Sequence, residues 1–288
     1  MWSIGIYTGD SPFQLQPPAN HTNPVLTGAD VTDVPAEFVA DPFMIKHAGR
    51  WHMFFEVKNS ENERGEIGLA FSDNAFTWSY QQIVLKDPFH LSYPYVFEWQ
   101  GEHYMLPETL GAAAVCLYKA DDFPARWSRQ FTLLDGAHAD PSLVYFNDLW
   151  WLFTCSAPYG HDVLRLYFAR DLVGPWKEHP RSPIVRGDKC RARPAGRVLT
   201  TKNGLIRFAQ ECEPQYGTRV RAFNISVMSR DHYVEFENKH SPVLSPGKHE
   251  WNGFGMHHLD AHQQANGQWI ACVDGRGSLP IADCQLPI

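Results

Sequence analysis

The sequence has no long hydrophobic run and no excess of positive charge. None of its apolar segments approaches the roughly 20 residues of a membrane-spanning helix, and the N-terminus lacks the basic-then-apolar pattern of a secretory signal. The formal net charge of −7 does not suit a surface that binds nucleic acid or an anionic membrane. We therefore expect a soluble, cytoplasmic protein that neither inserts into a membrane nor binds nucleic acid.

Cysteine pairs and the common cofactor motifs are also missing. No C-x-x-C pair occurs, and the cysteines are scattered at Cys116, Cys155, Cys190, Cys212, Cys272 and Cys284. In a chain of this size they indicate reduced, mostly buried thiols. Glycine-rich phosphate loops, a serine nucleophile elbow, a dinucleotide fingerprint and an HExxH zinc motif are absent as well. The sequence therefore predicts no cofactor.

What the chain does contain is a high proportion of apolar and aromatic residues, 44% and 14%. These proportions are typical of a well-packed globular protein rather than a disordered one. Its 288 residues are many for one ordinary core, but normal for a closed repeat fold or for two small domains. The sequence carries no indication of the oligomeric state.

A dipeptide that usually ends in proline recurs before apolar segments. Asp41-Pro42 and Asp140-Pro141 each precede such a segment, and Tyr93-Pro94, Arg193-Pro194 and His257-His258 occupy the equivalent positions. One Asp-Pro pair alone would indicate a turn, because Asp side chains often bind backbone amides there. Five equivalent positions at spacings of roughly fifty residues indicate a repeated structural unit instead.

The repeated unit predicts four short strands. In the first copy these are residues 41–45, 51–56, 66–72 and 82–85. Short antiparallel strands separated by turns at intervals of about ten residues form a single sheet rather than a βαβ unit.

The last copy has only its two inner strands, 257–261 and 269–274, whereas the N-terminal strands 2–7 and 23–27 have no partners nearby. If the N-terminal strands complete the last copy, the ring closes and both fragments gain partners. The predicted fold is therefore an all-β, five-bladed β-propeller with four-stranded blades. An irregular β-sandwich would not predict that the two ends complement each other. We expect one domain over residues 1–288, in which 1–30 close the last blade, 37–87, 88–137, 138–188 and 189–247 form blades one to four, and 248–288 supply the inner strands of blade five.

The equivalent positions predict a ligand site at one mouth of the central channel, where inner strands start and second strands end. The first set is Asp41, Tyr93, Asp140, Arg193 and His257; the second is Glu56, Glu108, Cys155, Gln210 and Asp274, with Glu211 beside Gln210. Nearly all are polar residues within apolar surroundings. Carboxylates accept hydrogen bonds from hydroxyl groups and aromatic faces cover C–H surfaces, so the expected ligand is a carbohydrate.

The run Asp30–Met44 is similar to the propeller domain at the N-terminus of plant glucosamine inositolphosphorylceramide transferases and in bacterial relatives. So are Pro88–Phe97, Ala192–Arg197 and Gly255–Asp260, and the resemblance covers nearly the whole chain. Asp41-Pro42 and Asp140-Pro141 also resemble the five-bladed glycosidases of glycoside hydrolase families 43, 32 and 68. That resemblance implies a first-blade Asp as general base or nucleophile, and a third-blade Asp that orients the substrate or tunes the pKa of the acid.

We therefore expect an enzyme of the glycoside hydrolase type that cleaves or transfers a glycosyl unit at the mouth. Asp41 is assigned as base or nucleophile and Asp140 as the orienting carboxylate. Family 43 enzymes carry their acid in blade four, where this chain has Arg193, so the acid is assigned to Glu108 or, second, to Glu211, which resembles the Glu-Cys pair of family 32. The residues assigned to substrate binding are Tyr93, Arg193, His257, His258, Glu56, Gln210 and Asp274, with Arg193 suited to an anionic sugar.

Alternatives remain open. A non-catalytic sugar-binding or accessory module in a glycan-assembly pathway is favoured by Arg193 in the usual acid position, and a protein-interaction propeller would not need buried acids. His258, Asp260 and His262 share one face of a predicted strand, which would suit a metal ion. A channel histidine hydrogen-bonded to water is the favoured interpretation, and no metal is expected.

Overall fold

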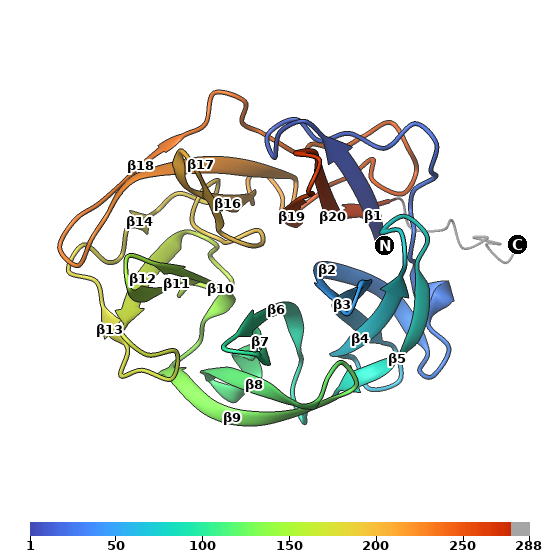
Figure 1. Cartoon of the computed structure of the whole chain (residues 1–288), viewed down its shortest axis with the longest axis horizontal. Coiled ribbons are helices and arrows are strands. Elements are labelled where there is room, and N and C mark those ends of the chain that lie inside the picture. Colours follow the sequence, from blue (N-terminus) through green and yellow to red (C-terminus); the bar gives the residue numbers. More distant parts are fainter. Residues whose placement is uncertain (278–288) are drawn as a thin grey trace, which may run out of the picture.

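Five antiparallel sheets stand around a common axis (Figure 1) in the computed structural model, which describes residues 1–277. We call these sheets blades one to five, in the order of their inner strands along the chain. Two short 3-10 helices, η1 (Gly28–Asp30) and η2 (Leu110–Ala112), lie in connections. The predicted five-bladed β-propeller is confirmed.

Blades one to four are each built from consecutive strands. Blade one contains β2 (Ala36–His47), β3 (Arg50–Asn59), β4 (Arg64–Ser72) and β5 (Ser79–Leu85). Blade two contains β6 (Ser92–Trp99), β7 (Glu102–Glu108), β8 (Ala114–Asp122) and β9 (Arg126–Asp135). Blade three contains β10 (Ala139–Phe146), β11 (Leu149–Cys155), β12 (Val163–Ala169) and the short β13 (Lys177–Glu178) and β14 (Val185–Arg186). Blade four contains β15 (Leu199–Thr201), β16 (Gly204–Glu211), β17 (Arg219–Met228) and β18 (Tyr233–Glu237).

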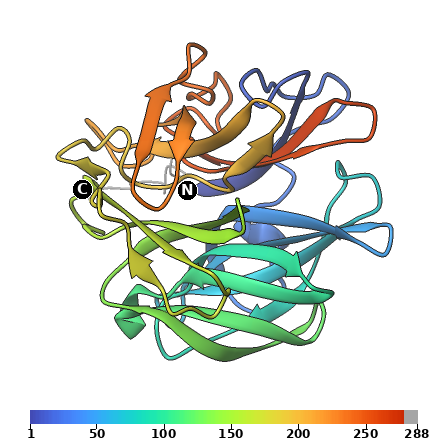
Figure 2. The same ribbon diagram turned by 60° about the vertical axis from the view of Figure 1, so that its left-hand side comes forward.

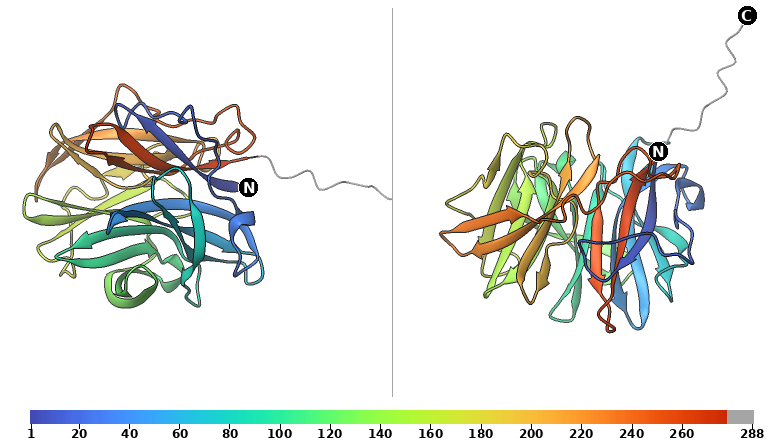
Figure 3. Two further views of the ribbon diagram at one scale, coloured as in Figure 1. Left: turned by 45° about the vertical axis from the view of Figure 1, so that its right-hand side comes forward. Right: turned by 90° about the horizontal axis from the view of Figure 1, so that it is seen from above.

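Blade five is closed by the N-terminus. Its strands β19 (Leu259–Gln263) and β20 (Trp269–Arg276) are followed outward by β1 (Trp2–Gly9), which pairs antiparallel with β20. The second N-terminal segment contributes a single bridge, in which the Ile4 N–H donates to the Leu26 carbonyl at 2.9 Å. Figure 3 shows blue β1 standing beside the red C-terminal strands. The predicted ring closure is therefore confirmed, although the segment at 23–27 forms an isolated bridge and not a strand.

The core lies between the blades, which pack face to face (Figure 2). Strands in the middle of a blade are covered on both sides by the neighbouring blades, so they consist of nearly continuous apolar runs. All seven residues of β11 are buried, whereas the outer strand β5 buries only Leu85. Phe43 of blade one packs with Tyr93 and Tyr95 of blade two. The apolar sequence of the second strands thus follows from their position between two neighbouring blades.

Three inner strands differ from the predicted bounds. β2 begins at Ala36, five residues before Asp41, because residues 36–40 continue the ladder with β3. β15 begins at Leu199 and not at Arg193; the intervening Gly196 has φ 121° and directs its N–H to the Tyr93 hydroxyl. β19 begins at Leu259 and not at His257, because the N–H groups of His257 and His258 bind the Asp274 carboxylate.

None of the helices within residues 1–277 is long and apolar enough to cross a membrane. The described cysteines are all free, and each is buried except Cys190, which is half-buried. Cys284 lies outside the described residues.

Candidate functional site

The proline-containing pairs of the first three blades are equivalent β-bulges. The ladder between the first two strands skips from Ala40 to Phe43 in blade one, and the same interruption occurs around Tyr93 and Asp140. The residue before each proline is left-handed, with φ 51° at Asp41, 49° at Tyr93 and 50° at Asp140. Left-handed backbone is uncommon in residues other than glycine, and bulges re-aim side chains. The sequence repeat therefore marks a repeated backbone device at the mouth of the channel.

A first cluster at the mouth is centred on Asp274 of β20, which is fully buried. Its Oδ1 accepts the backbone N–H groups of His257 and His258, each at 3.0 Å. Its Oδ2 accepts the Asp41 N–H at 3.2 Å and lies 2.7 Å from His257 Nδ1. Burial alone would raise the pKa of Asp274, but the His257 imidazole beside it lowers that pKa below its usual value. Asp274 thus remains ionised and holds the loop that precedes β19.

Asp41 lies at the edge of this first cluster with one oxygen unbound. Its Oδ1 is 3.8 Å from His257 Nδ1 and 3.7 Å from His258 Nδ1, and it has no hydrogen-bond partner among residues 1–277. Burial, and then the neighbouring carboxylate of Asp274, raise the pKa of Asp41 well above its ordinary value. Burial lowers the pKa of His258 to about 4. Asp41 is therefore a buried carboxyl group whose protonated form is favoured.

A metal ion could be held within this first cluster. Asp41, His257 and Asp274 each offer one ligand atom, and these atoms lie within 4.8 Å of one another. The metal alternative considered from the sequence is a different set, His258, Asp260 and His262, and in the structure Asp260 is already engaged. Its carboxylate pairs with Arg197 at 2.8 Å and with His262 at 3.0 Å, and it accepts the Met44 N–H at 2.8 Å. Asp260 therefore ties blade five to blades one and four.

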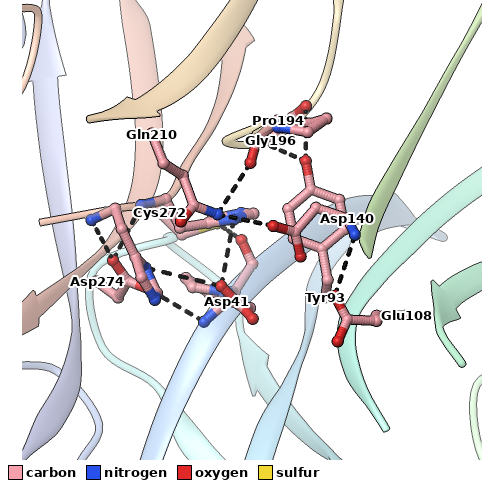
Figure 4. A network of polar contacts seen from close by, with 12 residues as sticks. Asp41, Tyr93, Glu108, Asp140, Pro194, Gly196, Gln210, Cys272 and Asp274 are labelled. Atoms are coloured by element: carbon pink, nitrogen blue, oxygen red, sulfur yellow. Dashed lines mark hydrogen bonds and ion pairs between the residues drawn. The ribbon is translucent and has the colours of Figure 1, made fainter. Parts of the chain in front are cut away.

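A second cluster joins blades two, three and four (Figure 4). Arg193 Nε lies 2.5 Å from Asp140 Oδ2, and its Nη2 lies 3.4 Å from Glu108 Oε2. Gln210 Nε2 donates to the same Asp140 oxygen at 2.8 Å, and the Asp140 N–H donates to Glu108 Oε2 at 3.1 Å. The structure therefore brings together four residues that the sequence assigned to the site.

Glu108 is the carboxyl group of the second cluster that is tuned toward acid chemistry. Burial, and then the Asp140 carboxylate, raise its pKa to about 8, although the Arg193 guanidinium partly opposes this shift. A general acid works best when its pKa lies near the operating pH. Glu108 is therefore protonated at neutral pH, as a general acid must be.

The loop between β11 and β12 also contributes to the mouth, which the sequence did not predict. Arg193 Nη1 donates to the Pro158 carbonyl at 3.0 Å and lies 3.1 Å from His161 Nδ1. Between these two residues stands Tyr159, whose side chain is 87% exposed. Its backbone therefore lies between two Arg193 contacts, and its aromatic side chain is exposed to solvent. A Pro-Tyr-Gly loop after a strand is a signal of an exposed turn, but it does not reveal the contact.

Two further aromatic rings cover the first cluster. The Trp2 ring stacks on the His257 imidazole at 3.9 Å, and the Tyr216 ring meets the same imidazole edge-on at 5.2 Å. The Arg193 guanidinium lies 5.0 Å from the centre of the Tyr216 ring. We call Trp2 and Tyr216 the aromatic rim. Trp2 lies on the first cluster, and Tyr216 contacts both His257 of the first cluster and Arg193 of the second.

The remaining candidates have partners of their own. Tyr93 is fully buried, and its hydroxyl accepts the Gly196 N–H at 2.5 Å and lies 2.8 Å from Ser142 Oγ. Glu211 pairs with Arg219 at 3.2 Å and Arg221 at 2.7 Å.

Glu56 forms an ion pair with His90 at 3.2 Å, and Cys155 is a buried thiol. Burial alone would lower the pKa of His90, but the Glu56 carboxylate raises it. Within residues 1–277, no side-chain hydrogen bond or ion pair connects Glu56 or Cys155 to either cluster.

Comparison with known proteins gives one family and one fold. The family model of the N-terminal region of glucosamine inositolphosphorylceramide transferase 1 matches residues 1–276. The transferase of that name from Oryza sativa subsp. japonica is 37% identical over 296 residues, covering 95% of this chain and 40% of that protein. The one from Arabidopsis thaliana is 35% identical over 295 residues, covering 95% and 39%. The chain thus spans about two fifths of the length of these relatives.

Solved structures share the fold at low sequence identity. The family 117 glycoside hydrolase Zg3597 from Zobellia galactanivorans superposes with a TM-score of 0.56 at 14% identity, covering 83% of this chain and 85% of that one. This likeness shows the propeller architecture alone. The resemblance to the N-terminal region of the transferases is thus confirmed as family membership. The resemblance to glycoside hydrolases is confirmed as a shared propeller fold.

Proposed function

Because the chain belongs to the family of the N-terminal region of glucosamine inositolphosphorylceramide transferase 1, we propose that it is a carbohydrate-active protein that binds a glycosyl unit at the channel mouth. The observation that carries this proposal is the aromatic rim beside buried carboxyl groups. Aromatic faces cover the C–H surface of a sugar, and carboxyl groups bind its hydroxyls. A sugar as the ligand class is supported by the relatives, which are glucosamine inositolphosphorylceramide transferases, and by a glycoside hydrolase that shares the fold.

The proposed chemistry is cleavage or transfer of the bound glycosyl unit. Glu108, with its raised pKa, is the proton donor to the leaving oxygen, and Asp41 is the base or nucleophile. Asp140 orients the substrate and keeps the pKa of Glu108 high through its own charge. The raised pKa of Asp41 requires that it loses its proton when the sugar binds, since a base or nucleophile must be ionised. His258 Nδ1 lies 3.7 Å from Asp41 Oδ1, but burial lowers the pKa of His258 to about 4, so the proton passes to solvent and not to His258.

Binding without turnover is the second candidate, and Arg193 favours it. Each nitrogen of its guanidinium lies close to a protein group: Asp140 at Nε, Pro158 and His161 at Nη1, Glu108 at Nη2. The Arg193 guanidinium favours the ionised form of Glu108 and so opposes the protonated form that a general acid needs. The same contacts leave Arg193 poorly placed to clamp an anionic sugar. A module that presents a glycan to a transferase would need the rim but not the acid.

One screen tests both candidates. Aryl-glycosides and a glycan panel are offered to the wild type, Asp41→Asn, Glu108→Gln and Glu211→Gln, with Glu61→Gln as an exposed control. Turnover that is lost in the first two variants and retained in Glu211→Gln and Glu61→Gln supports the assigned chemistry. Turnover that survives both Asp41→Asn and Glu108→Gln contradicts it. Binding without turnover supports the module. The absence of both binding and turnover across the whole panel would contradict a carbohydrate function.

A further inference from the structure

A second group of ionisable side chains lies at the opposite end of blades one and two. His47 is the last residue of β2, and Glu98 and His103 face each other across the β6–β7 hairpin. Asp41 stands six residues before His47 on the same strand. At about 3.3 Å per residue, the two ends of that segment are roughly 20 Å apart. This group is therefore separate from the channel mouth.

The three side chains converge on one point. One ligand atom from each of His47, Glu98 and His103 lies within 4.8 Å of the other two. Atoms at that spacing surround a point about 2.8 Å from each, so shifts of less than about 1 Å would bring them to the roughly 2.0–2.2 Å of zinc coordination. His47 and Glu98 are exposed and can make such shifts, whereas His103 is buried.

The environment of the His103 side chain is a second observation that points to a ligand at this place. That side chain is nine-tenths buried, and its ring stacks on Phe123 at 3.8 Å with an interplanar angle of 20°. The buried Nε2 has no hydrogen-bond partner among residues 1–277, and the nearest Glu98 oxygen is 3.9 Å away. A buried imidazole nitrogen without a partner is uncommon, because it has lost its water without replacement. The stacking on Phe123 holds the plane of the imidazole, whose Nε2 lies 3.9 Å from Glu98 and whose ring centre lies 4.8 Å from that of His47.

We propose that His47, Glu98 and His103 form a binding site for a first-row divalent metal ion such as Zn²⁺. Two imidazoles and one carboxylate are a donor set typical of zinc, and they leave a fourth position for water or another ligand. Phe123 also approaches the His47 ring, at 5.0 Å, and so provides an apolar side to the site. His52, whose ring lies 6.1 Å from that of His47, stands beside the three proposed ligands.

The test measures zinc binding to the untagged full chain after treatment with a chelator. Zn²⁺ is titrated in competition with a chromophoric chelator, and Co²⁺ is titrated by visible absorption. We expect one equivalent of tightly bound zinc. With Co²⁺, we expect the strong visible absorption of a four-coordinate site. Glu98→Gln and His47→Ala should weaken zinc binding by at least about tenfold. Both residues are exposed, so these variants should fold.

Two control variants make the outcome decisive. His232→Ala removes an exposed histidine elsewhere, and His257→Ala removes the histidine of the first cluster at the mouth. Zinc affinity unchanged in both controls and lost in His47→Ala and Glu98→Gln supports the proposal. Failure of the wild type to bind zinc, or affinity lost in His257→Ala instead, would overturn it.

Discussion

Arg193 Nε lies 2.5 Å from Asp140 Oδ2 at the mouth of the channel, and the two side chains are only 10% and 2% exposed. The guanidinium also reaches Glu108, so one buried cation serves two buried carboxyl groups. Both carboxyl groups cannot be ionised without leaving a net negative charge away from water. The proton that Glu108 retains at neutral pH follows from this arrangement.

Removing the shared cation should be strongly destabilising. Arg193→Met leaves Asp140 and Glu108 without their counter-ion, and breaking a buried pair in this way costs about 3–5 kcal/mol. Urea denaturation at neutral pH measures the loss in free energy of unfolding. The control is Arg50→Met, since Arg50 pairs with Asp73 where the side chains are 50% and 79% exposed and such pairs contribute about 0–1 kcal/mol. Equal losses in both variants would contradict the account of Arg193.

Stability should depend on pH through Glu108. The pKa of its carboxyl is raised from 4.5 to about 8 in the folded protein, so its contribution is complete below pH 4.5 and is lost as pH rises toward 8. In that window the unfolded chain releases the proton that the folded chain keeps, with a slope of up to about 1.4 kcal/mol per pH unit.

The matched variant for this pH dependence is Glu108→Gln, which cannot titrate. The free energy of unfolding of the wild type, measured by urea denaturation from pH 5 to 8, should fall relative to that of Glu108→Gln. Parallel curves for the two proteins would show that Glu108 is already ionised.

Ring closure by β1 should contribute heavily to stability. Ile6 is 1% exposed and pairs with Cys272 across the closing strands. Ile6→Ala should therefore lower the free energy of unfolding by about 2–5 kcal/mol, the usual cost of a cavity of this size. Val227→Ala, at a side chain that is 41% exposed, should change it by less than about 0.5 kcal/mol. A small effect of Ile6→Ala would mean that the N-terminus contributes little to the ring.

Tyr93 should act on stability rather than on sugar binding. Tyr93→Phe leaves the buried Gly196 N–H without its acceptor, which costs about 1–3 kcal/mol. Because Tyr93 is fully buried, its loss should leave the affinity for any bound sugar unchanged. Thermal unfolding and calorimetric titration measure the two effects, with the exposed Tyr159→Phe as the stability control. Weakened sugar binding by a fully folded Tyr93→Phe would restore the assignment of Tyr93 as a substrate contact.

The sequence predicts the repeat better than its local geometry. Asp41-Pro42 and its equivalents predict the blades and their common orientation, because a strand pattern repeated five times has few closed solutions. The left-handed backbone at Asp41, Tyr93 and Asp140 is not predicted, since a residue before proline usually adopts extended backbone. The bulge that imposes it exists only once the second strand is paired.

The partners within the site were also beyond sequence reasoning. Arg193, Asp140 and Glu108 come from three blades, so their ion pairs depend on how neighbouring blades pack. Polar character predicted that these positions mattered, but it did not separate Tyr93, which binds Gly196, from Asp41, whose Oδ1 has no hydrogen-bond partner within residues 1–277. The stacking of Trp2 on His257 likewise requires the ring to close.

The most direct test of the central claim is the crystal structure of the protein with the tightest-binding sugar from the glycan panel. The account predicts a sugar ring against Trp2 or Tyr216 with a hydroxyl or glycosidic oxygen within hydrogen-bond distance of Asp41 or Glu108. A sugar bound on the outer strands, or at the opposite end beside His103, would contradict it.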